Sequence, residues 1–288
     1  MVMPVINKHV LMSGTQFFND SYAINAHMDD KIPVDSAKAA TEHAQIANMM
    51  QQAGIQVTMV EPPKNSQDGV YTANWALIVG NKAVMANLPN IREEEEPYAQ
   101  AVLEARGYEV ITLTKDLHFS GQGDALPCGD YLFVGSSYRT SPLVHPILQK
   151  QLGLKVIGLK TIPQTGPDGA PVYNRVTGWP DSFFYDLDLA LAVISPTCIA
   201  WCPDAFMPES QSAIRAITDL EKIEVSLEEA MKGFACNLVS TSEAVVMSGH
   251  APLFKAQLEA KGLKVYSPEV TELLKGGGFI RCTTLTLS

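Results

Sequence analysis

The chain has 288 residues, 46% of them hydrophobic, which is enough material for a sizeable core in one large domain or two small ones. Its formal net charge of −10 disfavours nucleic acid and anionic membranes as partners, because both are bound by clustered lysines and arginines. No apolar run approaches the roughly 18 residues that span a bilayer, and Met1–Asn7 lacks an export signal, so we expect a soluble cytoplasmic protein.

One pattern recurs along the chain: an amphipathic helix, often ended by a glycine, and then a short β-branched strand. It covers residues 44–60, 99–113, 145–159, 212–225 and 253–268, of which the fourth copy is degraded. Gly54, Gly107, Gly153 and Gly262 stand where a helix ends in the left-handed conformation. They recur about every 50 residues, with one double interval, a period typical of solenoids, propellers and arrays.

Short apolar segments that resemble β-hairpins lie between these helices. They cover residues 76–86, 131–134, 189–200 and 239–246. Gly80-Asn81 in the first is a tight-turn signal. Each unit is therefore predicted as strand, strand, helix, strand, and five units can close in a ring that removes free sheet edges. A doubly wound parallel sheet is the alternative, but no GxGxxG or P-loop pattern follows the first strand.

In such a ring the inner strand ends converge on one axial pocket, so polar residues at those ends are candidate site residues. Three such segments are Asp68–Asn74, Phe119–Leu126 and Tyr185–Leu191. In a fourth, the glycine triplet Gly276–Gly278 leads to Cys282 at the predicted start of the last strand. Glycines permit φ > 0 and close approach, so Cys282 is a candidate nucleophile, with an ordinary buried cysteine as the alternative.

The other cysteines and acidic residues suggest simpler roles. The chain has five cysteines, Cys128, Cys198, Cys202, Cys236 and Cys282. Their odd number, without a CxxC pair or a short histidine spacing, speaks against a disulfide framework and a zinc site and favours a reducing compartment. The run Glu93–Glu96 is predicted as the solvated first turn of a helix, where acidic side chains suit the helix dipole.

The four segments, in this order on a fivefold repeat, resemble the pentein or guanidino-group-modifying superfamily. The resemblance is specifically to bacterial amidinotransferase-like proteins akin to dimethylarginine dimethylaminohydrolase and arginine deiminase. It covers nearly the whole chain and includes Tyr22–Asn25, Ser137–Thr140 and Phe234–Asn237. It implies an α/β fold, a five-bladed propeller of ββαβ repeats that forms a single domain over residues 1–288, without metal or cofactor.

The resemblance also implies a mechanism in which a thiolate attacks the central carbon of a guanidinium, an amine leaves, and water resolves the covalent intermediate. Cys282 matches the nucleophile, and Asp188 and Asp124 match carboxylates that orient the cation. A thiol of low pKa suits this chemistry.

Three further residues are expected around the amino-acid end of a substrate. Arg139 resembles the family arginine that clamps the substrate carboxylate, because a guanidinium binds a carboxylate through two hydrogen bonds. A surface arginine on a turn is the alternative. Asn74 and Asp68 are expected to hydrogen-bond the same end, with capping of a turn as an equal alternative.

Two residues that the family normally carries are replaced. The third motif normally reads Tyr-His-Leu-Asp, and its acid/base histidine falls on Asp186; the second begins Phe-Glu-Gly, and its substrate-binding glutamate falls on Ser120. A carboxylate at 186 can transfer protons if burial and Asp188 raise its pKa. None of the six histidines matches the family position, and His27 and His118 are candidates to compensate.

Replacement of the glutamate by Ser120 lowers the expected negative charge of the pocket and favours a smaller or neutral substrate. The leading hypothesis is a cysteine-dependent hydrolase acting on the C–N bond of a guanidino, ureido or related amino-acid derivative. A catalytically impaired binding protein for an arginine-like metabolite and an amidinotransferase, which passes the intermediate to an amine, stay open. The expected partner is a small molecule, and the sequence leaves a homodimer open.

Overall fold

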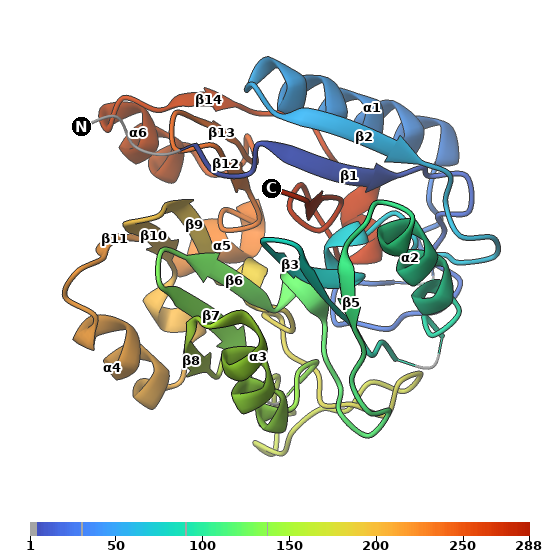
Figure 1. The fold of residues 1–288 in the computed structure, drawn as a ribbon, viewed down its shortest axis with the longest axis horizontal. Coiled ribbons are helices and arrows are strands. Elements are labelled where there is room, and N and C mark those ends of the chain that lie inside the picture. The colour runs from blue at the N-terminus through green and yellow to red at the C-terminus, as the bar shows by residue number, and fades with distance from the viewer. Residues whose placement is uncertain (1–4, 30, 90, 137) are drawn as a thin grey trace.

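The computed structural model describes residues 5–29, 31–89, 91–136 and 138–288. Within these residues the strands form five separate three-stranded sheets around a common centre, with the helices that cross between paired strands on the outside (Figure 1). The helices are α1 (Ser36–Gln52), α2 (Glu95–Glu104), α3 (His145–Leu152), α4 (Pro208–Ala216), α5 (Leu227–Gly233) and α6 (Pro252–Ala260). No helix in this part of the chain is both long and apolar enough to cross a membrane.

Four sheets follow one plan, an antiparallel hairpin and then a helix that crosses to a third, parallel strand. Their strands are β3 (Ala76–Val79), β4 (Lys82–Met85) and β5 (Glu109–Ile111); β6 (Ala125–Cys128), β7 (Tyr131–Gly135) and β8 (Lys155–Leu159); β9 (Leu191–Ser195), β10 (Cys198–Trp201) and β11 (Glu221–Glu224); and β12 (Val239–Ser240), β13 (Ala244–Val246) and β14 (Lys264–Tyr266). In the first, Leu77 pairs with Val84 and Ala83 with Val110. The parallel pair needs a crossover, which α2 supplies.

The fifth sheet joins the two ends of the chain. It consists of β1 (His9–Ser13), β2 (Gln56–Val60) and β15 (Leu285–Thr286). Strand β1 lies between its partners, antiparallel to β15 and parallel to β2. The predicted five-bladed α/β arrangement is confirmed. The expected loss of free edges is wrong, because the five sheets pack against each other without a continuous hydrogen-bonded ladder and each keeps its own edge strands.

The glycines that mark the repeat behave as predicted. Gly54, Gly107, Gly153 and Gly262 follow their helices with φ of +86°, +83°, +72° and +85°. Side chains are disfavoured there, whereas glycine turns the chain directly into the next strand. The degraded unit ends differently: α4 is followed by Ile217 in an extended conformation, and the unpredicted helix α5 begins after Ser226, whose side chain caps it through the Glu229 amide.

Three inner strands begin directly after short 3₁₀ turns, and this positions the site. The turns Thr72–Asn74, Gly121–Gly123 and Leu187–Leu189 precede β3, β6 and β9. Gly121 has φ of +61°, and a side-chain carbon there would come within 2.8 Å of the Ala73 carbonyl. Glycine therefore allows the first two turns to pack against each other, so that the polar residues of neighbouring sheets meet at one end of the axis.

Candidate active site

Cys282 lies in the turn before β15 and is 3% exposed. The prediction that Cys282 starts the last strand is wrong, because this strand begins at Leu285. The glycines that precede it allow close packing: a side-chain carbon on Gly278 would overlap the ring of Tyr71, and Gly277 has φ of +84°. Neighbouring groups therefore approach Gly277 and Gly278 too closely for a side chain. This agrees with the expectation that the glycines allow the close packing around Cys282.

Two side chains hold the thiol. Asn237 Nδ2 donates to Cys282 Sγ at 3.1 Å, and the thiol donates to Asp188 Oδ2 at 3.4 Å. The Asn237 carbonyl oxygen accepts the backbone amides of Arg281 and Cys282, which fixes the turn. Burial, and then the Asp188 charge, raise the pKa of the thiol well above its ordinary value. The expected low-pKa thiolate is therefore wrong for the unliganded protein.

Asp186, at the position of the expected histidine, lies beside Ser120. Asn74 Nδ2 donates to Asp186 Oδ2 at 2.8 Å and to Ser120 Oγ at 2.9 Å. A side-chain carbon on Gly123 would come within 2.7 Å of Asp186 Oδ2, so glycine makes room for the carboxylate. The Asp186 carboxyl group thus lies next to Ser120, the position at which the family glutamate is missing. Burial raises the pKa of Asp186, and the charge of Arg139 opposes this shift.

Asp188 is buried within the turn Leu187–Leu189, and Asp124 is buried against the same turn. Asp124 Oδ1 accepts the Leu187 amide at 2.9 Å and so holds the turn that carries Asp186 and Asp188. Burial, followed by the Asp186 charge, raises the pKa of both Asp124 and Asp188 well above the ordinary value. Asp188 is thus brought to the thiol, whereas Asp124 supports the turn.

A small cavity of about 10 Å³, roughly the space for one water, opens beside the thiol. It is lined by Ile24, Asn25, Asp68, Tyr71, Asn74, Arg92, Arg139, Tyr185, Gly276 and Cys282. Arg139 is 5% exposed, donates to the Ile24 carbonyl at 2.7 Å and lies 4.7 Å from the Tyr185 ring centroid, so it is not a surface arginine. Burial, the largest cause, raises the pKa of Asp68 to about 6.

Arg92 is a site residue that the sequence analysis missed. Its guanidinium donates to Asn74 Oδ1 at 3.0 Å and to both carboxylate oxygens of Glu95 at 2.8 Å. Glu95 is fully buried, so the predicted solvated role of the Glu93–Glu96 run is wrong for this residue. The only sequence signal is an arginine three residues before a glutamate at a helix start, which is common on exposed helices as well.

Three carboxylates of the site have unsatisfied atoms. Oδ1 of Asp68, of Asp186 and of Asp188 is buried without a hydrogen-bond partner among the described residues. A buried acceptor left without a donor costs about 1–3 kcal/mol, more when it is charged. Acceptors without donors around one thiol fit a ligand that brings positive charge and N–H groups.

The two histidines proposed to compensate lie elsewhere. His27 Nε2 contacts the Phe183 carbonyl at 2.9 Å, and its ring packs 4.2 Å from the Phe183 ring. His118 packs 4.2 Å from the ring of Trp179. Neither lines the cavity. Ser137 of the Ser137–Thr140 segment lies outside the described residues.

The fold and site together define a pentein-type protein, in which repeated α/β units bring a cysteine and carboxylates to the propeller axis. The profile of the family described as "N,N dimethylarginine dimethylhydrolase, eukaryotic" matches residues 14–288. The N(G),N(G)-dimethylarginine dimethylaminohydrolase of Mycobacterium tuberculosis is 33% identical over 96% of this chain and 84% of its own length. The chain therefore belongs to the dimethylarginine dimethylaminohydrolase family.

Bifunctional relatives share the same region. AgrE of Nostoc sp., an arginine dihydrolase/ornithine cyclodeaminase, is 31% identical over 96% of this chain, which spans 37% of that relative. The product-bound N-terminal domain of the arginine dihydrolase ArgZ superimposes with a TM-score of 0.86 and 29% identity, covering 97% of each chain. A variant of the same domain has been solved covalently bound to a reaction intermediate, with a TM-score of 0.86, 28% identity and 97% of each chain covered.

Proposed function

We propose that this protein is a cysteine-dependent hydrolase that breaks a C–N bond in the guanidinium group of an arginine-like amino-acid derivative. The observation that carries the proposal is a set of three buried carboxylates near Cys282, each with one oxygen that has no hydrogen-bond partner among the described residues. Asp68 lines the small cavity beside the thiol, Asp188 accepts the hydrogen bond of the thiol, and Asp186 is bound to Asn74, which lines the same cavity. A guanidinium supplies the missing charge and a planar array of N–H donors. Dimethylarginine and arginine, on which the relatives act according to their names, both carry this group.

The substrate itself supplies the charge that activates the thiol. In the unliganded protein, burial and then the charges of Asp188 and Asp186 keep the pKa of Cys282 high. A bound guanidinium offsets their charge, so the thiolate becomes accessible as the substrate binds. The thiolate then forms a C–S bond to the guanidinium carbon, and one C–N bond breaks with loss of an amine. Water attacks the resulting thiouronium, the C–S bond breaks, and a ureido product leaves.

Proton transfer is attributed in this proposal to Asp188 in preference to Asp186, and the position of Asp188 at the thiol supports this choice. Asp188 Oδ2 accepts the hydrogen bond of the thiol, so it is placed to take the thiol proton and deliver it to the leaving amine. After the amine has left, the same carboxylate is placed to accept a proton from the attacking water. Asp186 is tied to Asn74 beside Ser120 and is better placed to hold the cation, a role that replaces its expected acid/base function.

The other end of the substrate faces Arg139. Its guanidinium lines the cavity and is stacked on Tyr185. Among the described residues it donates to the Ile24 carbonyl, which leaves further N–H groups to bind a carboxylate. Asn74 is better explained as the bridge between Asp186 and Ser120 than as a ligand of the amino-acid end. Asp68 faces the cavity on the side of Arg92 and suits an ammonium or guanidinium group.

Three further expectations belong to the proposal. We place residues 1–288 in a single domain, because the first and last strands share a sheet. A reducing, cytoplasmic location is supported by five free cysteines. A homodimer is an expectation that solution measurements of mass have to test.

The test is intact-mass spectrometry after incubation with arginine, dimethylarginine and citrulline, with the ureido product and released amine measured in parallel. We expect a transient adduct on Cys282 and product from at least one guanidino compound, and neither with Cys282→Ser. Ligand binding without adduct or product would identify the impaired binding protein. Product formation that requires an added amine would identify the amidinotransferase. Turnover of citrulline alone would refute a guanidinium substrate.

A further inference from the structure

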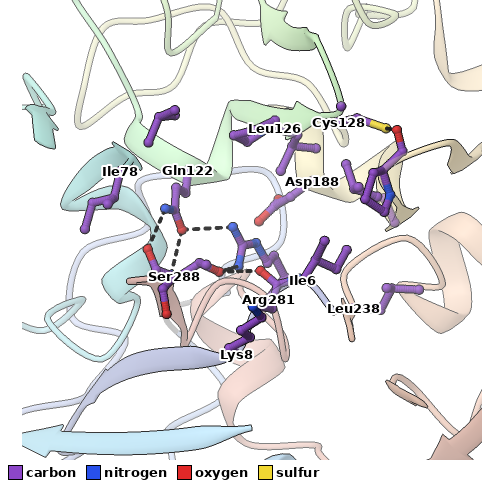
Figure 2. A pocket seen from close by; sticks show the side chains of 18 of the residues that line it. Ile6, Lys8, Ile78, Gln122, Leu126, Cys128, Asp188, Leu238, Arg281 and Ser288 are labelled. Carbon is purple, nitrogen blue, oxygen red and sulfur yellow. Dashed lines mark hydrogen bonds between the residues drawn. The ribbon is translucent and has the colours of Figure 1, made fainter. Parts of the chain in front are cut away.

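A second and larger cavity lies at the opposite end of the propeller axis. Its volume is about 370 Å³, and its rim includes the hairpin turns at Gly80, Gly129 and Pro196 together with residues 5–8 and 286–288. Figure 2 shows this space with Arg281, Gln122 and Asp188 among the side chains that line it. Cys282 lines the small cavity described above and is not among the residues that line the large one. A volume of this size is typical of small-molecule sites.

The walls of the large cavity are mainly aliphatic. They include Ile6, Ile78, Leu126, Leu191 and Leu238 (Figure 2 labels all but Leu191). Apolar walls with a few convergent polar groups are typical of ligand sites, because the walls supply affinity and the polar groups fix orientation.

Arg281 is the charged group that makes this cavity selective. It is 7% exposed and donates to Thr286 Oγ1 at 2.8 Å and to Gln122 Oε1 at 2.9 Å, both neutral acceptors. Among the ion pairs of the described residues, none involves Arg281, so no carboxylate comes within 4.0 Å of its guanidinium there. The carboxylate whose charge acts on it is Asp188, which does not come close enough to form an ion pair with it. A buried guanidinium without a close counter-charge is unfavourable unless an anion joins it.

We propose that this cavity is a binding site for a small apolar carboxylate, with its acid group on Arg281 and its hydrocarbon part along Leu126 and Leu191. Lys8, also on the lining and exposed, adds positive charge at the mouth. Two N–H bonds of a guanidinium match the two oxygens of a carboxylate, which favours an acid over an alcohol of the same length.

Binding there reaches the catalytic thiol through two contacts. The Arg281 amide donates to Asn237 Oδ1, and Asn237 Nδ2 holds Cys282 Sγ. Asp188 lines the large cavity and also accepts the thiol hydrogen bond. An anion on Arg281 neutralises a cation near the thiol, so the thiolate forms less readily and the apolar carboxylate acts as an inhibitor.

The binding test compares octanoate, octanol and octylamine by isothermal titration calorimetry with the full chain at pH 7. Octanoate is expected to bind at least about tenfold more tightly than octanol, which is uncharged, and than octylamine, which is cationic. Leu126→Trp, which fills the cavity, should lower the affinity for octanoate at least tenfold. Leu143→Trp, at a position 67% exposed, should leave this affinity unchanged. A diazirine-bearing octanoate on the unmodified protein should crosslink to residues 122–129 or 188–196, which keeps the test valid if Leu126→Trp does not fold.

Several results would overturn the proposal: no binding of any probe, equal binding of octanol, octanoate binding unaffected by a folded Leu126→Trp, or crosslinks confined to other segments. The coupling has its own readout, the rate at which iodoacetamide alkylates Cys282. Saturating octanoate should slow it several-fold and octanol should not, and the effect should disappear in Leu126→Trp. An unchanged rate would refute the coupling even with octanoate bound. Cys282 serves here only as a reporter thiol, so a failed binding test leaves the proposed hydrolase function intact.

Discussion

Asp186→Asn isolates the charge that this protein places where the family normally has a histidine. The side chain is 1% exposed, Oδ2 is held by Asn74, and Oδ1 has no donor among the described residues. A ligand guanidinium that donates to Oδ1 forms a charge-assisted hydrogen bond, worth about 1.5–3 kcal/mol. Because about 1.4 kcal/mol corresponds to a factor of ten, Asp186→Asn should weaken binding of a guanidino compound about 10- to 150-fold.

Binding is measured by calorimetry in a Cys282→Ser background, so that turnover does not consume the ligand. A neutral ureido ligand should lose much less affinity, because it carries no charge for Asp186 to compensate. Asp130→Asn, at an exposed position, is the matched control and should change neither affinity. The reasoning is refuted if Asp186→Asn binds the guanidino compound as tightly as before, or loses equal affinity for both ligands.

Two other predictions follow from buried contacts. The side chains of Arg92 and Glu95 are 5% and 0% exposed, so Glu95→Gln leaves a buried guanidinium without its counter-charge. The variant should lower the free energy of unfolding by about 3 kcal/mol in urea denaturation. An unchanged midpoint would show that the pair is dispensable. Asn237→Ala removes the donor to Cys282 Sγ and should move the pH profile of Cys282 alkylation to higher pH, with activity reduced at least about tenfold. A profile that does not move would remove Asn237 from thiol activation.

The repeat could be predicted from the sequence because its signals are local. A glycine after a helix and a turn signal within a hairpin depend on neighbouring residues, and Gly54 and Gly107 adopt the expected positive φ. The helix α5 and the separate sheet edges could not be predicted in this way. Their existence depends on packing between units, which the local pattern does not contain.

The contacts within the site could not be predicted from the sequence, because they join residues that are far apart in the chain. Cys282, Asp188 and Arg139 were found through motif resemblance, but their environment depends on residues far away in the chain. Asn74 contacts Asp186 across 112 positions, so the sequence alone did not show that the Asp186 carboxyl group lies next to Ser120. The raised pKa of the thiol was missed for the same reason, because burial depends on the assembled ring.

Asp68 provides a test of the buried charge through stability. Burial raises its pKa in the folded protein from the ordinary 3.8 to about 6. Between these values the folded state holds a proton that the unfolded state has released, so stability falls as the pH rises through this window. The full effect is about 3 kcal/mol, since each tenfold difference in proton affinity corresponds to about 1.4 kcal/mol.

Other carboxylates of the site act in the same direction, so the comparison with Asp68→Asn is needed to isolate this group. The variant keeps the size of the side chain and an acceptor for Gln67, which donates to Asp68 at 2.8 Å. Urea denaturation at intervals from pH 3.5 to 7.5 should show the variant gaining about 3 kcal/mol over the original protein as the pH rises. Parallel stability curves would mean that Asp68 is not forced to carry a buried charge, and its expected contact with a cationic substrate would lose its physical basis.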